Sequence, residues 1–114
     1  MTADAPVLVL VRDLILSSRI TATAKELGVA YRLLRNPALL PGETGRLLIV
    51  DLNLPDALEQ AAAWQKSKQC DVVGFVSHVD ADTINRAREA GLQKVMARSR
   101  FVELLPAILA PTVD

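Results

Sequence analysis

The sequence predicts one α/β domain with a five-stranded parallel sheet that is covered by helices on both faces. Four short runs rich in Val, Ile and Leu are separated by segments with helical periodicity. Apolar and polar residues do not alternate within these runs, which is typical of strands buried on both faces of a parallel sheet. The chain has 114 residues, a length that one hydrophobic core serves. We therefore expect a single domain over residues 1–114, with a core over about residues 6–110.

The apolar runs give the positions of the strands. Four of them are well marked and lie at residues 7–11, 47–50, 72–76 and 95–97. A fifth, less regular strand is expected at residues 30–35. Strands that alternate with helices predict parallel pairing, because each crossover returns the chain to the same end of the sheet.

The first helix is predicted directly after the first strand. Leu16, Ile20, Ala24 and Leu27 recur at helical spacing. Gly28 follows them, and glycine is typical of the position just beyond a helix.

The second crossover is expected to contain a shortened helix. Residues 37–45 read PALLPGETG, with two prolines and two glycines, so this segment has room for at most one helical turn. Asp56 and Glu59 resemble a capping box that starts the following helix, which is expected to run to about Lys66.

Two more helices are predicted in the last third of the chain. Either Asp80 or Asp82 is expected to cap the first of them, which runs to Gly91, and Ser99 is expected to cap the second. Pro106 removes one backbone hydrogen bond from the second helix and is expected to bend it. An apolar stripe at i, i+3, i+4, i+7 and i+8 is expected to face the sheet, and it consists of Phe101, Leu104, Leu105, Ile108 and Leu109.

The composition excludes several classes of protein. Thirteen Lys and Arg residues face thirteen Asp and Glu residues, so the net charge is zero, whereas proteins that wrap nucleic acid or coat anionic membranes carry a basic excess. Apolar residues make up 51% of the chain, which excludes a disordered protein. No apolar run approaches the roughly 20 residues of a membrane-spanning helix. Because Cys70 is the only cysteine, we expect a soluble cytoplasmic protein without disulfides.

The residues just past each strand are expected to be neighbours. In an open parallel sheet, binding sites lie beyond the carboxyl ends of the strands. These positions hold Arg12 and Asp13, residues 51–55, Ser77 and His78, and Arg98 and Ser99.

These strand ends carry a resemblance to a known family. The third strand is followed by DLNLPD at residues 51–56, Ser77 follows the fourth strand, and Arg98 precedes a helix after the fifth. A turn reading EAG at residues 89–91 lies in the same register. The sequence thus resembles a response-regulator receiver domain of the CheY-like kind over nearly the whole chain. The resemblance implies a flavodoxin-like three-layer sandwich with strand order 2-1-3-4-5.

The resemblance also implies roles for four residues. Asp51 matches the aspartate that accepts a phosphoryl group from a histidine kinase. Asp13 matches one of two acidic residues that hold Mg²⁺ together with the acceptor, and Asn53 matches the residue whose backbone carbonyl binds the metal. Ser77 matches a hydroxyl that binds the phosphoryl oxygens. Such a pocket is needed because a carboxylate is a weak nucleophile towards a negatively charged phosphoryl group.

Four positions depart from the family pattern. Arg12 stands where the family has its first acidic residue, and Arg98 replaces a lysine. Val95 replaces an aromatic residue whose rotation often reports phosphorylation. His78 is bulkier than the usual small residue at its position, and its ring would restrict access to the phosphoryl site.

These departures predict a pseudo-receiver. Asp13 and Asp51 are balanced by two arginines, which weakens the attraction for Mg²⁺ without excluding the ion. We expect Arg12 to pair with Asp51 or Asp13 in place of the metal. That pairing would lower the pKa of the carboxyl group and slow its phosphorylation. We therefore expect no required cofactor, at most a weak Mg²⁺ site at Asp13, Asp51 and Asn53, and no enzymatic activity beyond self-phosphorylation of Asp51.

The expected function is that of a protein-interaction module in signal transduction. Basic residues cluster after the fourth strand, against the single acidic residue Glu89 between them. In the family this region is the common output and dimerisation face, so we expect an acidic signalling partner, such as a histidine kinase or an output protein, and a homodimer is compatible with it. Nucleic acid and membranes are not expected partners. The basic residues of this face are Arg86, Arg88, Lys94 and Arg100.

Two other functions stay open. The chain is alternatively a functional two-component receiver of a phosphorelay, phosphorylated on Asp51 by a histidine kinase. A flavin carrier is a third hypothesis, but the RDLIL sequence after the first strand lacks the Ser, Thr and Gly residues that cradle a phosphate. We interpret Trp64 as a helix-packing residue and Cys70 as inert, because both lie away from the strand ends.

Overall fold

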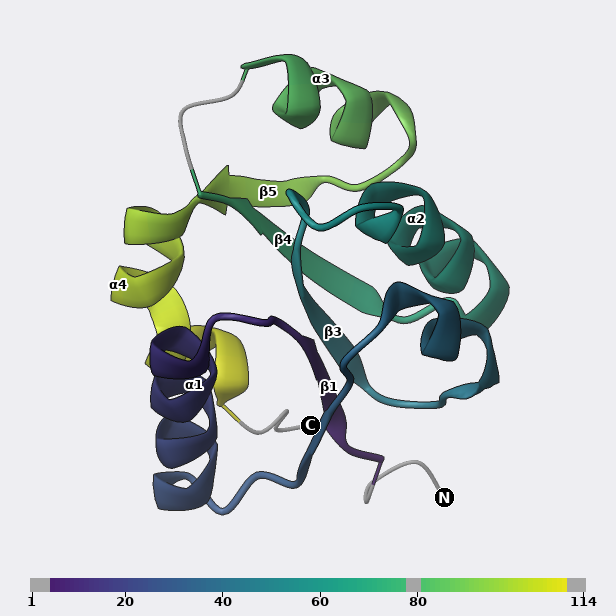
Figure 1. Cartoon of the computed structure of the whole chain (residues 1–114). Helices are drawn as coiled ribbons and strands as arrows, with labels where there is room; N and C mark the ends of the chain where they lie inside the picture. Colours follow the sequence, from purple (N-terminus) through teal and green to yellow (C-terminus); the bar gives the residue numbers. More distant parts are fainter. Residues whose placement is uncertain (1–4, 78–80, 111–114) are drawn as a thin grey trace.

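Five parallel strands form the central sheet in the order β2-β1-β3-β4-β5. The computed structural model describes residues 5–77 and 81–110, and Figure 1 shows the sheet between two layers of helices. The predicted α/β class and strand order are confirmed. The strands are β1 (Val7–Leu10), β2 (Tyr31–Leu33), β3 (Leu47–Asp51), β4 (Asp71–Val76) and β5 (Lys94–Ala97).

Helices cover both faces of this sheet. On one face lie α1 (Leu14–Glu26) and α4 (Arg98–Leu109), which are adjacent in Figure 1. On the other face lie the 3₁₀ helix η1 (Pro37–Gly42), α2 (Ala57–Lys68) and α3 (Ala81–Glu89). None of the helices in the described part of the chain is long and apolar enough to cross a membrane.

The unbroken apolar runs are explained by this two-sided covering. In β1, Val7 and Val9 pack towards α1 and α4, whereas Leu8 and Leu10 pack towards η1 and α2. All four side chains are fully buried. A strand between two helical layers therefore has no face on which a polar side chain would be solvated.

Two predicted capping interactions are wrong, although α2 starts where the sequence predicted it. Asp56 precedes α2, but it has a left-handed backbone (φ 65°) and its side chain makes no capping hydrogen bond. Ser99 lies inside α4, because β5 passes directly into the helix at Arg98. Asp82 lies in the first turn of α3, and Asp80 falls outside the described residues. The predicted end of α1 is confirmed, since Gly28 has a φ of 69° just beyond the helix.

The second crossover holds a short helix, as predicted, but this helix is longer than the single turn that was expected. η1 has six residues, about two turns of a 3₁₀ helix. Asn36 starts it by accepting a hydrogen bond from the Ala38 backbone N–H at 2.9 Å. Trp64 of α2 donates its Nε1–H to the Glu43 carbonyl just past η1 at 3.0 Å and is almost fully buried. The interpretation of Trp64 as a packing residue is confirmed.

The apolar stripe of α4 faces the sheet. Phe101, Leu105 and Leu109 are buried, and the Phe101 ring stacks on Phe75 of β4 with centroids 4.8 Å apart. The other two residues of the stripe, Leu104 and Ile108, are only partly buried. This difference leaves room beside α4 for the groove considered below.

Candidate functional site

The sheet brings most of the predicted site residues to one edge. Asp51 is the last residue of β3, Asp13 precedes α1, Ser77 follows β4, and Arg98 follows β5. Because the strands are parallel, these four residues all lie beyond their carboxyl ends. His78 was predicted to belong to the same group, but it lies outside the described residues.

Asp51 is the buried acid of this edge. Its Oδ1 accepts a hydrogen bond from the backbone N–H of Asn53 at 2.9 Å, and only 9% of its surface is exposed. Burial raises the pKa of Asp51 above its ordinary value, and the negative charge of Asp13 adds to this effect. The Asn53 N–H and the positive charge of Arg98 act in the opposite direction but do not cancel it.

Asp13 forms an ion pair with Arg98. Its Oδ2 lies 2.8 Å from Nη2 of Arg98, and each side chain is about one-third exposed. Its Oδ1 accepts a hydrogen bond from the Leu16 backbone N–H at 3.0 Å and thereby caps α1. These two interactions, the Leu16 N–H first and Arg98 second, lower the pKa of Asp13. Both carboxylate oxygens are thus engaged.

Asn53 and Ser77 join the ends of β3 and β4. The Ser77 backbone N–H donates to Asn53 Oδ1 at 2.6 Å. Both residues are exposed. Asn53 therefore orders two elements at once, since its own N–H bonds to Asp51 and its side chain accepts from Ser77.

The predicted pairing of Arg12 is wrong. Arg12 is exposed, and its Nε donates to the backbone carbonyl of Arg35, beyond β2, at 3.5 Å. Among the described residues, it forms no ion pair with Asp13 or Asp51. The cation that balances Asp13 is Arg98, because α4 begins directly after β5 and places the guanidinium beside the start of α1.

The strand ends offer few carboxylate ligands that are free of other interactions. Within residues 5–77 and 81–110, no three His, Cys, Asp or Glu side chains come together as metal ligands. Both oxygens of Asp13 take part in interactions within the fold, Arg12 supplies no carboxylate, and Arg98 brings a positive charge to Asp13. Magnesium prefers one or two uncommitted carboxylates with several waters.

The basic face is partly neutralised by acids that are distant in sequence. Arg86 pairs with Glu59 of α2 at 2.9 Å, and Lys94 pairs with Asp71 of β4 at 3.3 Å. Counting charges along the sequence missed these partners, because they belong to other elements. Arg88 and Arg100 are exposed and form no ion pair with any described residue.

Two exposed apolar residues were missed by the sequence reasoning. Leu14 and Ile15, which follow Asp13 in the first turn of α1, are 80% and 83% exposed. Their signal was present in the sequence, since neither belongs to the apolar stripe of Leu16, Ile20 and Ala24 that faces the sheet. Large apolar side chains beside a polar site commonly mark a contact surface.

Solved response regulators share this fold. One from Burkholderia pseudomallei, solved with a phosphorylated aspartic acid, calcium ion and citrate, matches with a TM-score of 0.76 and 20% identity, over 93% of this chain and 66% of that protein. A CheY-like receiver domain protein from Methanospirillum hungatei matches with a TM-score of 0.75 and 14% identity, over 92% and 93% of the two chains. The beryllofluoride-activated DrrB receiver domain, from Thermotoga maritima, matches with a TM-score of 0.76 and 17% identity, over 90% and 92%.

These similarities establish the receiver fold of the chain. No protein-family model and no curated protein sequence matches it. The likeness therefore lies in the three-dimensional structure, and the roles of individual residues have to be argued from their own geometry.

Proposed function

We propose that this chain is a receiver-like signalling domain that acts by binding another protein, with phosphorylation of Asp51 weak or dispensable. In this proposal it is a cytoplasmic module and not an enzyme beyond self-phosphorylation. The receiver fold supports a place in signal transduction, and the altered residues of the strand-end site support the loss of dependence on phosphate.

The ion pair between Asp13 and Arg98 is the observation that carries the proposal. It places a fixed guanidinium where a metal-binding acid would otherwise be free. With Arg12 turned towards Arg35, Asp51 forms no ion pair with any described residue. A single buried carboxylate beside a cation attracts Mg²⁺ weakly.

The test is a titration followed by amide NMR, first with Mg²⁺ and then with beryllofluoride. We expect no saturable shifts at the amides of Asp13, Asp51 and Ser77 in the unmodified chain. The matched variant is Arg12→Asp, which restores an acid at an exposed position and is expected to gain Mg²⁺ affinity. Saturable shifts at millimolar Mg²⁺ in the unmodified chain would contradict the proposal.

Partner binding gives the second arm of the test. Asp51→Asn removes the acceptor but keeps an oxygen for the Asn53 N–H, so it is expected to leave partner affinity unchanged. Charge reversal at Arg88 and Arg100 is expected to weaken the binding of an acidic partner, and the loss of affinity should be larger at low salt than at high salt. Reversal at Arg19, an exposed residue of α1, is the control. Loss of binding in Asp51→Asn with the fold intact would count against the proposal.

A working receiver is the second candidate. The Burkholderia protein, whose fold this chain shares, carries a phosphorylated aspartic acid. Asp51 is buried at the end of its strand, and Asn53 and Ser77 lie beside each other at the next strand end, where the family's phosphoryl pocket would be. If acetyl phosphate and Mg²⁺ add one phosphoryl group to the chain and Asp51→Asn prevents it, this second function is the correct one.

A further inference from the structure

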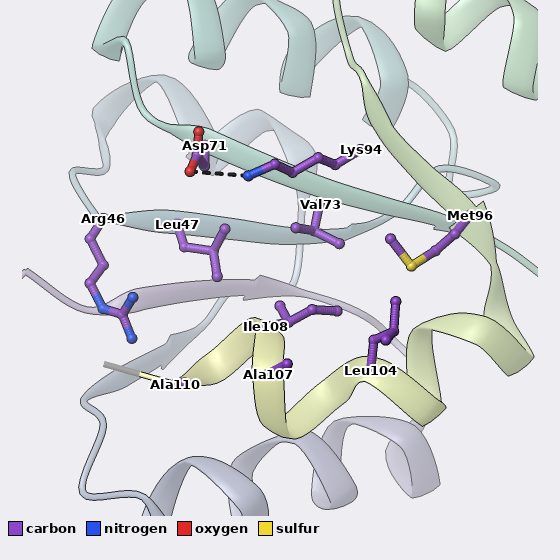
Figure 2. Close-up of a pocket in the computed structure, with 10 residues that line it drawn as sticks. All are labelled: Arg46, Leu47, Asp71, Val73, Lys94, Met96, Leu104, Ala107, Ile108 and Ala110. Carbon is purple, nitrogen blue, oxygen red and sulfur yellow. Dashed lines mark hydrogen bonds and ion pairs between the residues drawn. The ribbon is translucent and has the colours of Figure 1, made fainter. Parts of the chain in front are cut away.

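A groove lies at the opposite end of the sheet from the strand-end site. It is bounded by the amino-terminal halves of β3 and β4, by β5 and by the second half of α4, and its volume is about 390 Å³. Figure 2 shows side chains from all four elements around this space. Small-molecule sites have volumes of roughly 300–1,000 Å³, so the groove is large enough for one.

The walls of the groove combine aliphatic side chains with charged ones. Leu47, Val73 and Met96 come from three neighbouring strands and project from the face that α4 covers. Leu104 and Ile108 of α4 lie opposite them in Figure 2. Both α4 residues remain partly exposed. Ala107, which has only a methyl group, lies between them in the sequence and also lines the groove.

Charged side chains occur on this same face. Asp71 lies beside Leu47 in the strand register, and Lys94 lies beside Val73. The two charged groups pair with each other at 3.3 Å, so Lys94 is already balanced by an acid. The third charged residue that lines the groove is Arg46. The net charge of the lining residues is therefore plus one.

Arg46 is the cation of the groove that forms no ion pair with a described residue. Its Nη2 donates to the Leu109 carbonyl at 3.1 Å, which fixes the guanidinium at the end of α4. No acid among the described residues lies within ion-pair distance of it. The Leu109 carbonyl carries only a partial charge, and a guanidinium has five N–H donors of which this bond uses one. A carboxylate is the group that this geometry suits best.

We propose that this groove binds a small aliphatic monocarboxylate. The carboxylate is held by Arg46, and the hydrocarbon chain lies along Ile108 and Leu104 towards Met96. Arg46 and Met96 stand at opposite ends of the groove in Figure 2. The distance from β3 to β5 is two strand spacings, about 10 Å, so a chain of medium length such as octanoate fills it. A neutral molecule of the same shape gains the apolar contacts but no partner for Arg46.

The experiment is a titration of the full chain with octanoate, below its micelle concentration, followed by amide NMR. Saturable shifts are expected at Leu47, Val73 and Met96, and none at Asp13 or Asp51. Octanamide has the same chain without the charge and is expected to bind at least about tenfold more weakly, the loss of one charge-assisted pair.

Two variants complete the test. Arg46→Gln is expected to reduce octanoate affinity to that of octanamide, and Arg19→Gln, which removes an exposed charge from α1, is expected to leave it unchanged. Ile108→Glu places a carboxylate in the groove at a partly exposed position and is expected to abolish binding. The proposal is overturned if octanoate gives no saturable shifts, if octanamide binds equally well, or if the shifts lie outside the groove.

Discussion

The backbone N–H of Ser77 donates a hydrogen bond of 2.6 Å to the side chain of Asn53, so a residue beyond β3 holds the end of β4. Asn53→Ala is expected to destabilise the fold by about 1 kcal/mol, because the N–H loses its acceptor. The faster exchange of the Ser77 amide with solvent is the direct measurement. Asn53→Asp keeps an acceptor oxygen and is the control. Equal exchange rates in Asn53→Ala and the unmodified chain would refute the role of this bond.

Asp13 pairs with Arg98 and caps α1, and two substitutions can separate these roles. Asp13→Asn removes the charge opposite Arg98 but keeps an oxygen for the Leu16 N–H, since Asn and Asp are equally good caps. Asp13→Ala removes both interactions and is expected to lower the melting temperature further than Asp13→Asn. An equal loss in the two variants would mean that the cap contributes nothing.

The lowered pKa of Asp13 also sets a pH dependence. A carboxyl group with a lowered pKa in the folded chain stabilises the fold above its unfolded pKa, and this contribution disappears as the pH falls through the folded value. The difference in melting temperature between Asp13→Asn and the unmodified chain is therefore expected at neutral pH and should vanish in acid.

Asp51 is expected to show the opposite sign. Its raised pKa means that the folded chain holds this proton more tightly than the unfolded chain does. Stability is therefore lost as the pH rises from the ordinary range of an aspartic acid through the raised value. Asp51→Asn cannot ionise and is expected to melt at a higher temperature than the unmodified chain at pH 7 and at the same temperature in acid. A lower melting temperature of Asp51→Asn at pH 7 would argue against desolvation as the dominant cause.

Trp64 joins α2 to the end of η1. Trp64→Phe keeps the aromatic packing but leaves the Glu43 carbonyl without its Nε1–H donor, so a loss of about 1 kcal/mol is expected in urea unfolding followed by circular dichroism. Trp64→Ala is expected to cost about 3–5 kcal/mol, because it also leaves a cavity at a buried site. Tyr31→Phe, at a half-buried aromatic residue of β2, is the control.

Gly45 and Gly42 are expected to respond differently to the same substitution. A Cβ atom at Gly45 would lie 2.6 Å from the Pro6 carbonyl oxygen, whereas nothing lies within 4 Å of one at Gly42. Gly45→Ala is therefore expected to destabilise the fold by about 1–3 kcal/mol. Gly42→Ala is expected to be neutral or slightly stabilising. Chemical denaturation of the two variants checks this contrast.

The sheet was predictable because its strands are buried on both sides. An apolar run such as residues 47–50 has no competing explanation when turn residues flank it. The capping interactions of the helices were less predictable. Asp56 and Ser99 have side chains suited to capping, but the backbone enters α2 through a left-handed residue and enters α4 straight from a strand. The path of the backbone is set by packing, which overrode the local preference of these residues.

The clustering of four strand-end residues was predictable, but their pairing was not. The strand-end rule brought Asp13, Asp51, Ser77 and Arg98 to one edge. Which arginine meets Asp13 depends on side-chain direction, and adjacent residues on an extended chain point to different sides. Arg12 points towards the neighbouring edge strand, so the pair formed with Arg98 instead.

β5 passes directly into α4, with no loop between the strand and the helix. Arg98 forms an ion pair with Asp13, and three residues later the ring of Phe101 stacks on that of Phe75. A partner that bound Arg98 would therefore have to compete with Asp13 for the guanidinium. The rest of α4 packs on the sheet through Leu105 and Leu109, which are almost fully buried.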